Sequence, residues 1–172
     1  MAILDILEAP HPILSAKARV VQEDEFGEEL KLFLENMAIT MYAAPGVGLA
    51  APQVGDSRRI IVADPGNNDD GIPRLLYSMV NPEITEKSKE YITYEESCLS
   101  VPEFYINVKR YQKITLRWRD AFGNVRQEIF EEFPAIVLQH EMDHLDGLTL
   151  LDRSSRFRRS RYISKRKKQR RS

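Results

Sequence analysis

The sequence predicts an α+β fold in which antiparallel or mixed β-sheets pack around a central helix. Strand patterns follow one another through the middle of the chain, and helical patterns lie on either side of them, which favours this class over an alternating α/β one. The 172 residues are 42% hydrophobic and 30% charged, which suits one domain with its own core. A basic segment ends the chain and adds a C-terminal helix or tail.

The first helical pattern covers residues 25–42 and forms the predicted N-terminal helix. Its hydrophobic residues recur at helical spacing, and Pro45-Gly46 stops it. These residues are Leu30, Phe33, Leu34, Met37 and Met41. The glycine- and alanine-rich segment GVGLAAPQVG follows, and it predicts a tight loop or short strand with close backbone approach.

Strand patterns dominate from residue 58 to residue 133. RRIIVAD is followed by an exposed loop, DPGNNDDGIP, and then by further strand patterns. In order these are LLYSMVNP, YITYEESCLSVP, INVKRYQKITLRWRDAFGN and VRQEIFEEF, with AFGN as a hairpin turn. From Pro134 the pattern becomes helical, and Gly147 lies just past the end of this central helix.

The net charge of −1 conceals a strong asymmetry. Residues 1–152 contain all 26 acidic residues, whereas residues 153–172 contain 11 of the 25 lysines and arginines and no acid. We therefore expect a main domain over 1–152 and a basic tail over 153–172. Charge of one sign favours a polyanionic partner for the tail.

The sequence carries no sign of export or membrane insertion. No run approaches the roughly 18 apolar residues of a membrane span, and MAILDILEAP lacks the basic and apolar regions of a secretory signal. The single cysteine, Cys98, allows no intrachain disulfide and favours a reducing compartment. We expect a cytoplasmic protein with no membrane partner.

The segment QHEMDHLDG (139–147) places His140 and His144 four residues apart on the central helix. Residues at this spacing share one helix face, so both imidazoles can reach one cation, with Glu141 beside them. Such a string can also be a solvated helix face. Here the apolar residues 136–138 indicate a buried helix, in which histidines without a purpose would be costly. The pattern predicts a central metal-binding helix.

The third ligand of this site should come from upstream. Zinc proteases with this string take a Glu or His from downstream, but only aspartates follow, and Leu150 stands where the longer protease pattern has histidine. The upstream candidates are His11, in a proline-flanked surface turn, and Cys98, in an apolar strand. A lone buried cysteine is often only a small hydrophobe. Because the two histidines lack a third ligand, we favour Cys98 as a metal ligand over Cys98 as a core residue. A thiolate with two imidazoles leaves a fourth position open for water, as in catalytic sites.

Three motifs in this order resemble those of the peptide deformylase family, which removes the formyl group from the N-terminal methionine of new bacterial or organellar proteins. GVGLAAPQ (46–53) resembles the first, ESCLS (96–100) the second, and QHEMDHLDG the third. The opening MAILDILEAPHPIL is also similar, so the resemblance runs from residue 1 to about residue 150. Ser97 replaces the glycine usual in the second motif, next to the bound peptide. Tyr94 and Tyr105 also depart from the expected types and would reshape the pocket rim.

The resemblance implies a set of catalytic roles. Cys98, His140 and His144 would bind the metal, and Glu141 would be the general acid/base for attack by a metal-bound water on the formyl group. The Gln53 side-chain amide and the Leu99 backbone N–H would stabilise the oxyanion. From the residues alone, Gln53 could equally cap a loop. Glu96 would orient His140, or it is simply a charged strand residue.

The substrate-binding candidates follow from the same resemblance and from their apolar character. Val47, Phe133, Ile136 and Val137 are candidates for a methionine pocket, although each could be ordinary core. Ser97 would neighbour the peptide, and Gly48 would let an extended peptide approach as an added strand. A dinucleotide-binding fingerprint also fits the glycines of GVGLAAPQ. It needs a preceding strand and a following helix, and here a helix precedes and an extended segment follows.

The cofactor and partners can also be predicted. Cys/His₂ ligation by itself suits zinc, whereas the resemblance implies ferrous iron as the one divalent metal, with zinc, nickel or cobalt as substitutes. The expected substrates are N-formyl-Met nascent peptides. The resemblance implies action at the ribosome near the exit tunnel, where the basic tail would bind RNA.

Two other functions remain open from the sequence alone. A metallopeptidase or another amidase would share the metal and Glu141 but would lack a small formyl pocket. A non-enzymatic module would have a closed structural metal site and would bind nucleic acid through the tail.

Overall fold

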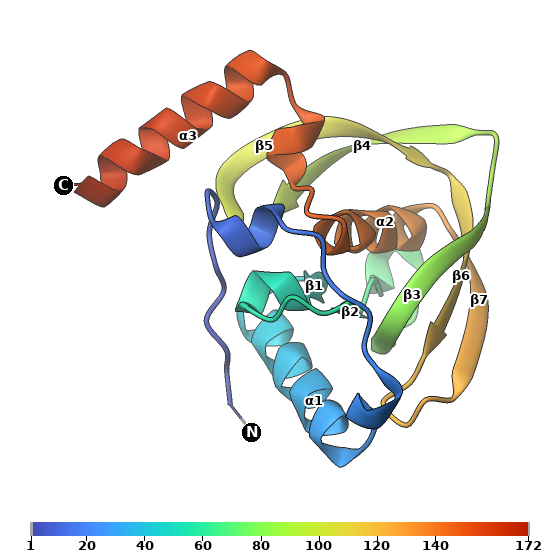
Figure 1. Ribbon diagram of the computed structural model, residues 1–172. Coiled ribbons are helices and arrows are strands. Elements are labelled where there is room, and N and C mark those ends of the chain that lie inside the picture. The colour runs from blue at the N-terminus through green and yellow to red at the C-terminus, as the bar shows by residue number, and fades with distance from the viewer. Residues whose placement is uncertain (1, 172) are drawn as a thin grey trace.

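The computed structural model describes residues 2–171 and confirms the α+β class (Figure 1). The helices are α1 (Glu28–Ala43), α2 (Phe133–Leu145) and α3 (Arg156–Arg171). The strands are β1 (Gly48–Ala50), β2 (Ile60–Ala63), β3 (Tyr77–Lys87), β4 (Tyr91–Cys98), β5 (Val101–Tyr111), β6 (Lys113–Arg119) and β7 (Val125–Glu131). Each helical pattern in the sequence therefore corresponds to a helix.

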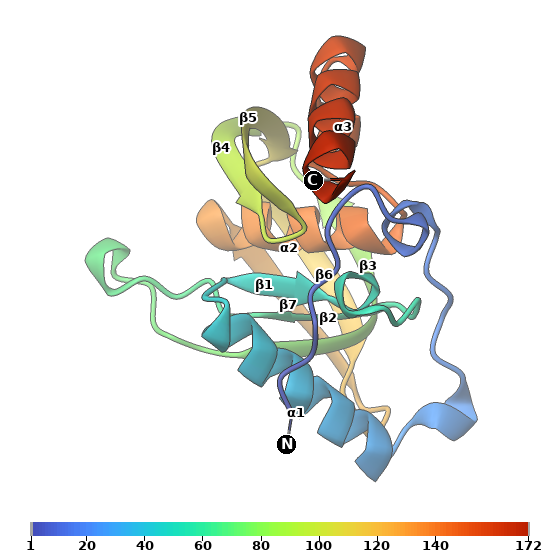
Figure 2. The ribbon, with the colours of Figure 1, turned by 90° about the vertical axis from the view of Figure 1, so that its left-hand side faces the viewer.

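Two antiparallel sheets enclose α2. One has five strands in the order β1-β2-β3-β6-β7, and the other is the β4-β5 hairpin. Side chains alternate between the faces of β2: Ile60 and Val62 pack with α1, and Ile61 and Ala63 pack with α2. The central helix therefore lies between the five-stranded sheet and the hairpin, with α1 on the outer face of the sheet (Figure 2).

Local chemistry sets the limits of α2. Pro134 lies in its first turn, where a missing N–H costs nothing, and Gly147 follows its end at φ +77°. A Cβ on Gly147 would lie 2.8 Å from the Ser15 carbonyl oxygen, so only glycine fits there. The predictions that Pro134 lies in the first turn of this helix and that Gly147 follows its end are therefore confirmed. The two histidines lie in the last two turns of the helix, which is largely buried.

Three strand predictions were wrong. The single strand expected from Ile106 to the AFGN turn is divided at Gln112 between β5 and β6. The strand expected to end at Pro82 continues to Lys87, because a register irregularity that begins after Val80 accommodates the proline, and Asn81 adopts φ +51°. The single strand expected over 91–102 is two, because the chain reverses at Leu99-Ser100 and Cys98 pairs with Val101. This reversal places Cys98 at a hairpin end.

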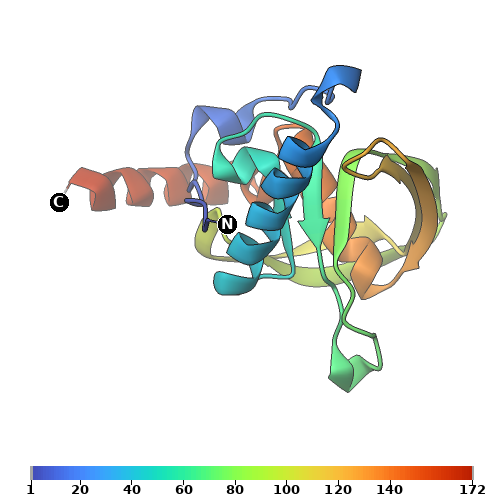
Figure 3. The ribbon, with the colours of Figure 1, turned by 90° about the horizontal axis from the view of Figure 1, so that it is seen from below.

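The basic segment is the 16-residue helix α3, which extends from the rest of the chain (Figure 3). Tyr162 and Ile163 attach it to a small core cluster that includes residues of β5. Arg166 also forms an ion pair with Glu8, so both ends of the described chain meet here. No helix within residues 2–171 has the length and apolar character needed to cross a membrane.

Candidate active site

A cysteine and two histidines meet at the end of the β4-β5 hairpin. The Sγ of Cys98 lies 3.3 Å from Nε2 of His144, and the ligand atoms of Cys98, His140 and His144 all lie within 4.8 Å of one another. The two histidines come from successive turns of α2, and the hairpin carries the thiol to them. His11, the other upstream candidate, instead caps a short 3₁₀ helix through Nδ1, which accepts from Ile13 N–H at 3.2 Å.

A buried carboxylate orients one of these histidines. Oε1 of Glu96 lies 2.9 Å from Nδ1 of His140, which leaves the Nε2 of that ring for the cluster. Both oxygens of Glu96 also accept from Arg110, at 2.8 Å each. The Glu96 side chain therefore has the contacts expected of a group that orients His140.

Arg110 and Asp143, whose contacts no sequence motif indicated, extend this network. Arg110 is almost fully buried and donates to Asp143 Oδ2 at 2.7 Å, and Asp143 in turn accepts from Arg153. The signal was present in β5: buried residues alternate at 104, 106, 108 and 110, and the last is an arginine. A buried arginine requires carboxylate partners, and Glu96 and Asp143 provide them.

The pKa values of the two buried glutamates of the site, Glu96 and Glu141, are shifted in opposite directions. Burial tends to raise the pKa of Glu96, but hydrogen bonds from Arg110 and His140 outweigh it and hold that pKa below its usual value. Burial raises the pKa of Glu141 to about 7, because Glu141 lacks such donors. Burial also lowers the pKa of His144, which keeps its ring neutral. One carboxylate is thus fixed as an anion while the other can exchange a proton near neutral pH.

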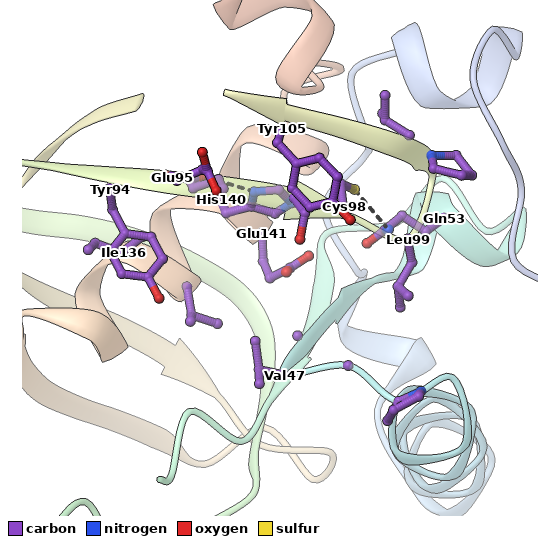
Figure 4. Close-up of a pocket in the computed structure, with 18 of the residues that line it drawn as sticks. Val47, Gln53, Tyr94, Glu95, Cys98, Leu99, Tyr105, Ile136, His140 and Glu141 are labelled. Carbon is purple, nitrogen blue, oxygen red and sulfur yellow. Dashed lines mark hydrogen bonds and ion pairs between the residues drawn. The ribbon is translucent and has the colours of Figure 1, made fainter. Parts of the chain in front are cut away.

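Gln53 and Leu99 lie on the opposite side of the cluster from Tyr94 and Ile136 (Figure 4). Gln53 is buried, and its Oε1 accepts from Ala50 N–H at 2.9 Å, which fixes the orientation of the amide. Its Nε2 donates to Ser100 Oγ at 3.0 Å and lies 3.7 Å from Cys98 Sγ. Within residues 2–171 the Leu99 backbone N–H has no hydrogen-bond acceptor. Both predicted donors therefore lie beside the thiol.

A cleft of about 530 Å³ opens over the cluster, between β1 and the β4-β5 hairpin. All six predicted substrate-binding residues line it: Val47, Gly48, Ser97, Phe133, Ile136 and Val137. Figure 4 places Val47 at the lower side and Tyr105 at the upper side, with Glu141 between them. The ring of Tyr94 packs on Phe133 with centroids 5.5 Å apart, and both residues line the cleft.

Gly48 makes room for the Glu141 carboxylate. A Cβ at position 48 would lie 2.4 Å from Oε2 of Glu141, closer than real contacts allow. Gly48 also belongs to β1, the terminal strand of its sheet, which among residues 2–171 pairs with β2 alone. Gly48 therefore leaves space for the Glu141 carboxylate and lies on an open strand edge.

The residues fit one divalent metal. A thiol and two imidazoles are three good donors for such an ion, and they converge without any fourth protein ligand within residues 2–171. The buried Oε1 of Glu141 has no hydrogen-bond partner among the same residues. An α+β fold with these donors, a neighbouring carboxylate and a cleft is typical of metal-dependent hydrolases.

Comparison with known sequences identifies the family. A family model described as Polypeptide deformylase matches residues 3–160. The peptide deformylase of Erythrobacter litoralis is 40% identical, with 99% of this chain and 98% of that protein aligned, and that of Zymomonas mobilis is 42% identical, with 99% and 96% aligned. The chain therefore belongs to the polypeptide deformylase family. Its activity is the metal-dependent removal of the N-terminal formyl group from nascent polypeptides.

Solved structures of peptide deformylases are similar to the structure of this chain. A peptide deformylase from Ehrlichia chaffeensis in complex with actinonin aligns over all of both chains, with a TM-score of 0.92 and 34% identity. A Met-Ala-Ser-bound peptide deformylase from Acinetobacter baumannii aligns over 88% of this chain and 98% of its own, with a TM-score of 0.81 and 35% identity. The expected fold and enzyme class are confirmed.

Proposed function

We propose that Cys98, His140 and His144 hold the metal and that Glu141 is the proton-transfer group of the deformylation reaction. The observation that carries this proposal is the convergence of the three ligand atoms within 4.8 Å, beside the helix that carries both histidines and Glu141. The bound cation would supply a Lewis acid for the formyl oxygen and would lower the pKa of the attacking water. The remaining steps fall to residues of the chain.

Glu141 moves the protons. Its carboxylate takes a proton from the attacking water and passes it to the departing amine nitrogen, so that the formyl C–N bond breaks and formate leaves. A pKa near 7 suits both steps, because the group must accept and then release a proton at neutral pH. Glu96 does not compete for this role, because Arg110 holds it as an anion.

Gln53 and Leu99 stabilise the oxyanion. Because Ala50 N–H fixes Gln53 Oε1, the amide nitrogen is presented toward Cys98 and the cleft. The Leu99 backbone N–H lies on the next residue after the thiol. Two preorganised donors at one oxygen position lower the barrier through interactions that strengthen as charge develops.

The peptide lies between β1 and the β4-β5 hairpin. Its backbone pairs with the open edge of β1 near Gly48, and Ser97 contacts it from the other side. The first side chain enters the apolar end of the cleft. Val47, Phe133, Ile136 and Val137 form this end, and Tyr94 closes it. An unbranched methionine side chain suits such a narrow space.

We infer that the native metal is ferrous iron, with zinc, nickel or cobalt as substitutes. Anaerobically purified protein should contain close to one iron per chain and should deformylate formyl-Met-Ala. Cys98→Ser should lower metal content sharply, with activity falling in proportion. A Cys98→Ser variant with wild-type metal content and rate would refute the ligand assignment. An acetyl-Met-Ala control separates deformylation from general amide hydrolysis.

We also infer that α3 contacts ribosomal RNA near the exit tunnel and that the enzyme acts in the cytoplasm. The exposed cations Arg161, Lys165, Lys167 and Lys168 support this interpretation, because they form no ion pair within the described residues. Arg158, Arg159 and Arg166, by contrast, are engaged with the chain itself. Charges without protein partners are available to phosphates.

Co-sedimentation with ribosomes tests the RNA contact. Replacing Lys165, Lys167 and Lys168 by alanine should weaken binding most at low salt and reduce the salt dependence of affinity. Lys31→Ala, on α1, is the matched control, because it removes a lysine far from α3. Equal ribosome affinity for the triple variant and wild type at low salt would reject this role.

A further inference from the structure

The C-terminal helix touches one wall of the substrate cleft. This wall is the rim segment, residues 102–105 at the start of β5, of which Pro102, Glu103 and Tyr105 line the cleft. In two perpendicular views α3 lies beside this end of the β4-β5 hairpin (Figures 1 and 2). The basic helix therefore contacts the part of the cleft that faces Val47.

Two side chains of α3 make these contacts. The Tyr162 hydroxyl donates to the Pro102 carbonyl oxygen at 2.9 Å, and its ring packs edge-on against Phe104 with centroids 5.4 Å apart. The Arg158 guanidinium donates to the Tyr105 carbonyl oxygen at 3.0 Å and lies 4.9 Å from the Phe104 ring centroid. Three of the four rim residues thus have a direct partner on α3.

The fourth residue shows why the rim needs this support. Glu103 has φ +61°, a left-handed conformation that a non-glycine residue adopts rarely and that persists only where its surroundings fix it. The Glu103 side chain is exposed and has no hydrogen bond or ion pair within residues 2–171. The conformation is therefore fixed by its neighbours, and α3 holds the residues on both sides.

We propose that α3 is part of the substrate-binding apparatus, with Tyr162 and Arg158 as positioning residues that hold the rim segment against the peptide. This inference rests on the proposed placement of the peptide between β1 and the hairpin. The formyl group and the first side chain meet the metal cluster and the apolar end, so the rim segment contacts later peptide residues. Losing α3 contacts should therefore weaken the binding of longer peptides and leave the chemical step unchanged.

Steady-state kinetics with two substrate lengths test this proposal. Tyr162→Ala should raise KM about fivefold for a formylated tetrapeptide and less than about twofold for formyl-Met-Ala, with kcat nearly unchanged for both. Tyr162→Phe, which loses only the hydroxyl, should give roughly a twofold rise in KM for the tetrapeptide. Arg156→Ala, which removes an exposed cation of the same helix, is the matched control and should resemble wild type.

Amide hydrogen exchange provides a second readout that needs no turnover. The Glu103 to Tyr105 amides should exchange several times faster in Tyr162→Ala than in wild type, and Arg156→Ala should not change them. If Tyr162→Ala does not fold, Tyr162→Phe and Arg158→Lys decide the question by the same two measurements.

The outcomes are distinct. An unchanged KM for the tetrapeptide in folded variants, or an equal rise for both peptide lengths, overturns the positioning role of α3. A wild-type enzyme without activity on either formylated peptide instead refutes the proposed function itself.

Discussion

His140 and Glu96 are joined by a buried contact of 2.9 Å between Nδ1 and Oε1, and the same Oε1 accepts from Arg110. Groups that orient a metal-ligating histidine typically contribute 10- to 100-fold in metal affinity. We therefore expect Glu96→Gln to weaken metal binding by about tenfold, measured by competition with a chelator. Glu95→Gln, at the exposed neighbouring carboxylate, is the control and should keep wild-type affinity. Equal affinities for all three proteins would assign Glu96 to stability alone.

Glu141→Gln should remove turnover and preserve the metal site. The substitution keeps the size of the side chain but eliminates its proton transfer, which typically contributes about 10²- to 10⁴-fold to the rate. We expect a fall in kcat of this order with metal content within error of wild type, measured by elemental analysis of the same samples. Loss of metal in proportion to activity would show that Glu141 acts as a ligand.

The raised pKa of Glu141 makes the stability of the metal-free protein depend on pH. A carboxyl whose folded-state pKa is about 7 favours folding while it is protonated. This contribution is fully present below the usual carboxyl pKa and is lost as the pH rises toward 7, by up to about 1.4 kcal/mol per pH unit. Chemical denaturation of wild type and Glu141→Gln should show wild type losing stability relative to the variant between about pH 5 and pH 7. Parallel profiles would place the Glu141 pKa near its usual value.

Gly48→Ala should disable the enzyme through Glu141. The added methyl would lie 2.4 Å from Oε2 of Glu141, so the carboxylate must move. We expect kcat/KM to fall by about 100-fold, a loss within the range for misplacing a proton-transfer group. Metal content should remain at the wild-type level. In the Gly48→Ala/Glu141→Gln double variant the two effects should not add, because they act on the same step. Additive losses would indicate that Gly48 acts on peptide binding instead.

The helix that carries the candidate metal ligands could be predicted from sequence, because helix geometry converts spacing directly into proximity. His140 and His144 must share a face once the helix forms, and the missing downstream ligand pointed to Cys98. Their convergence agrees with this reasoning, while the role of each residue stays a prediction. The family, fold class and enzyme class are confirmed.

The reversal after Cys98 could not be predicted, since the Leu99-Ser100 turn lacks the glycine or asparagine that usually marks a hairpin. Arg110 and Asp143 were missed because their partners are distant in sequence. Arg110 is 14 residues from Glu96 and 33 from Asp143. Strand pairing, and not local pattern, brings them together. The position of the tail was also not predictable, because Tyr162 of α3 contacts Phe104, a residue distant in sequence.

The chain has one cysteine, and that cysteine lies in the proposed metal site. A thiol-specific reagent can therefore label the protein at one known residue. A chromogenic disulfide reagent should react with one equivalent of thiol in metal-free protein and far more slowly once the metal is bound. The fraction of protected thiol would then count the loaded active centres in a preparation, with no background from other cysteines. A fluorophore attached at Cys98 would mark the catalytic cleft without any prior mutagenesis.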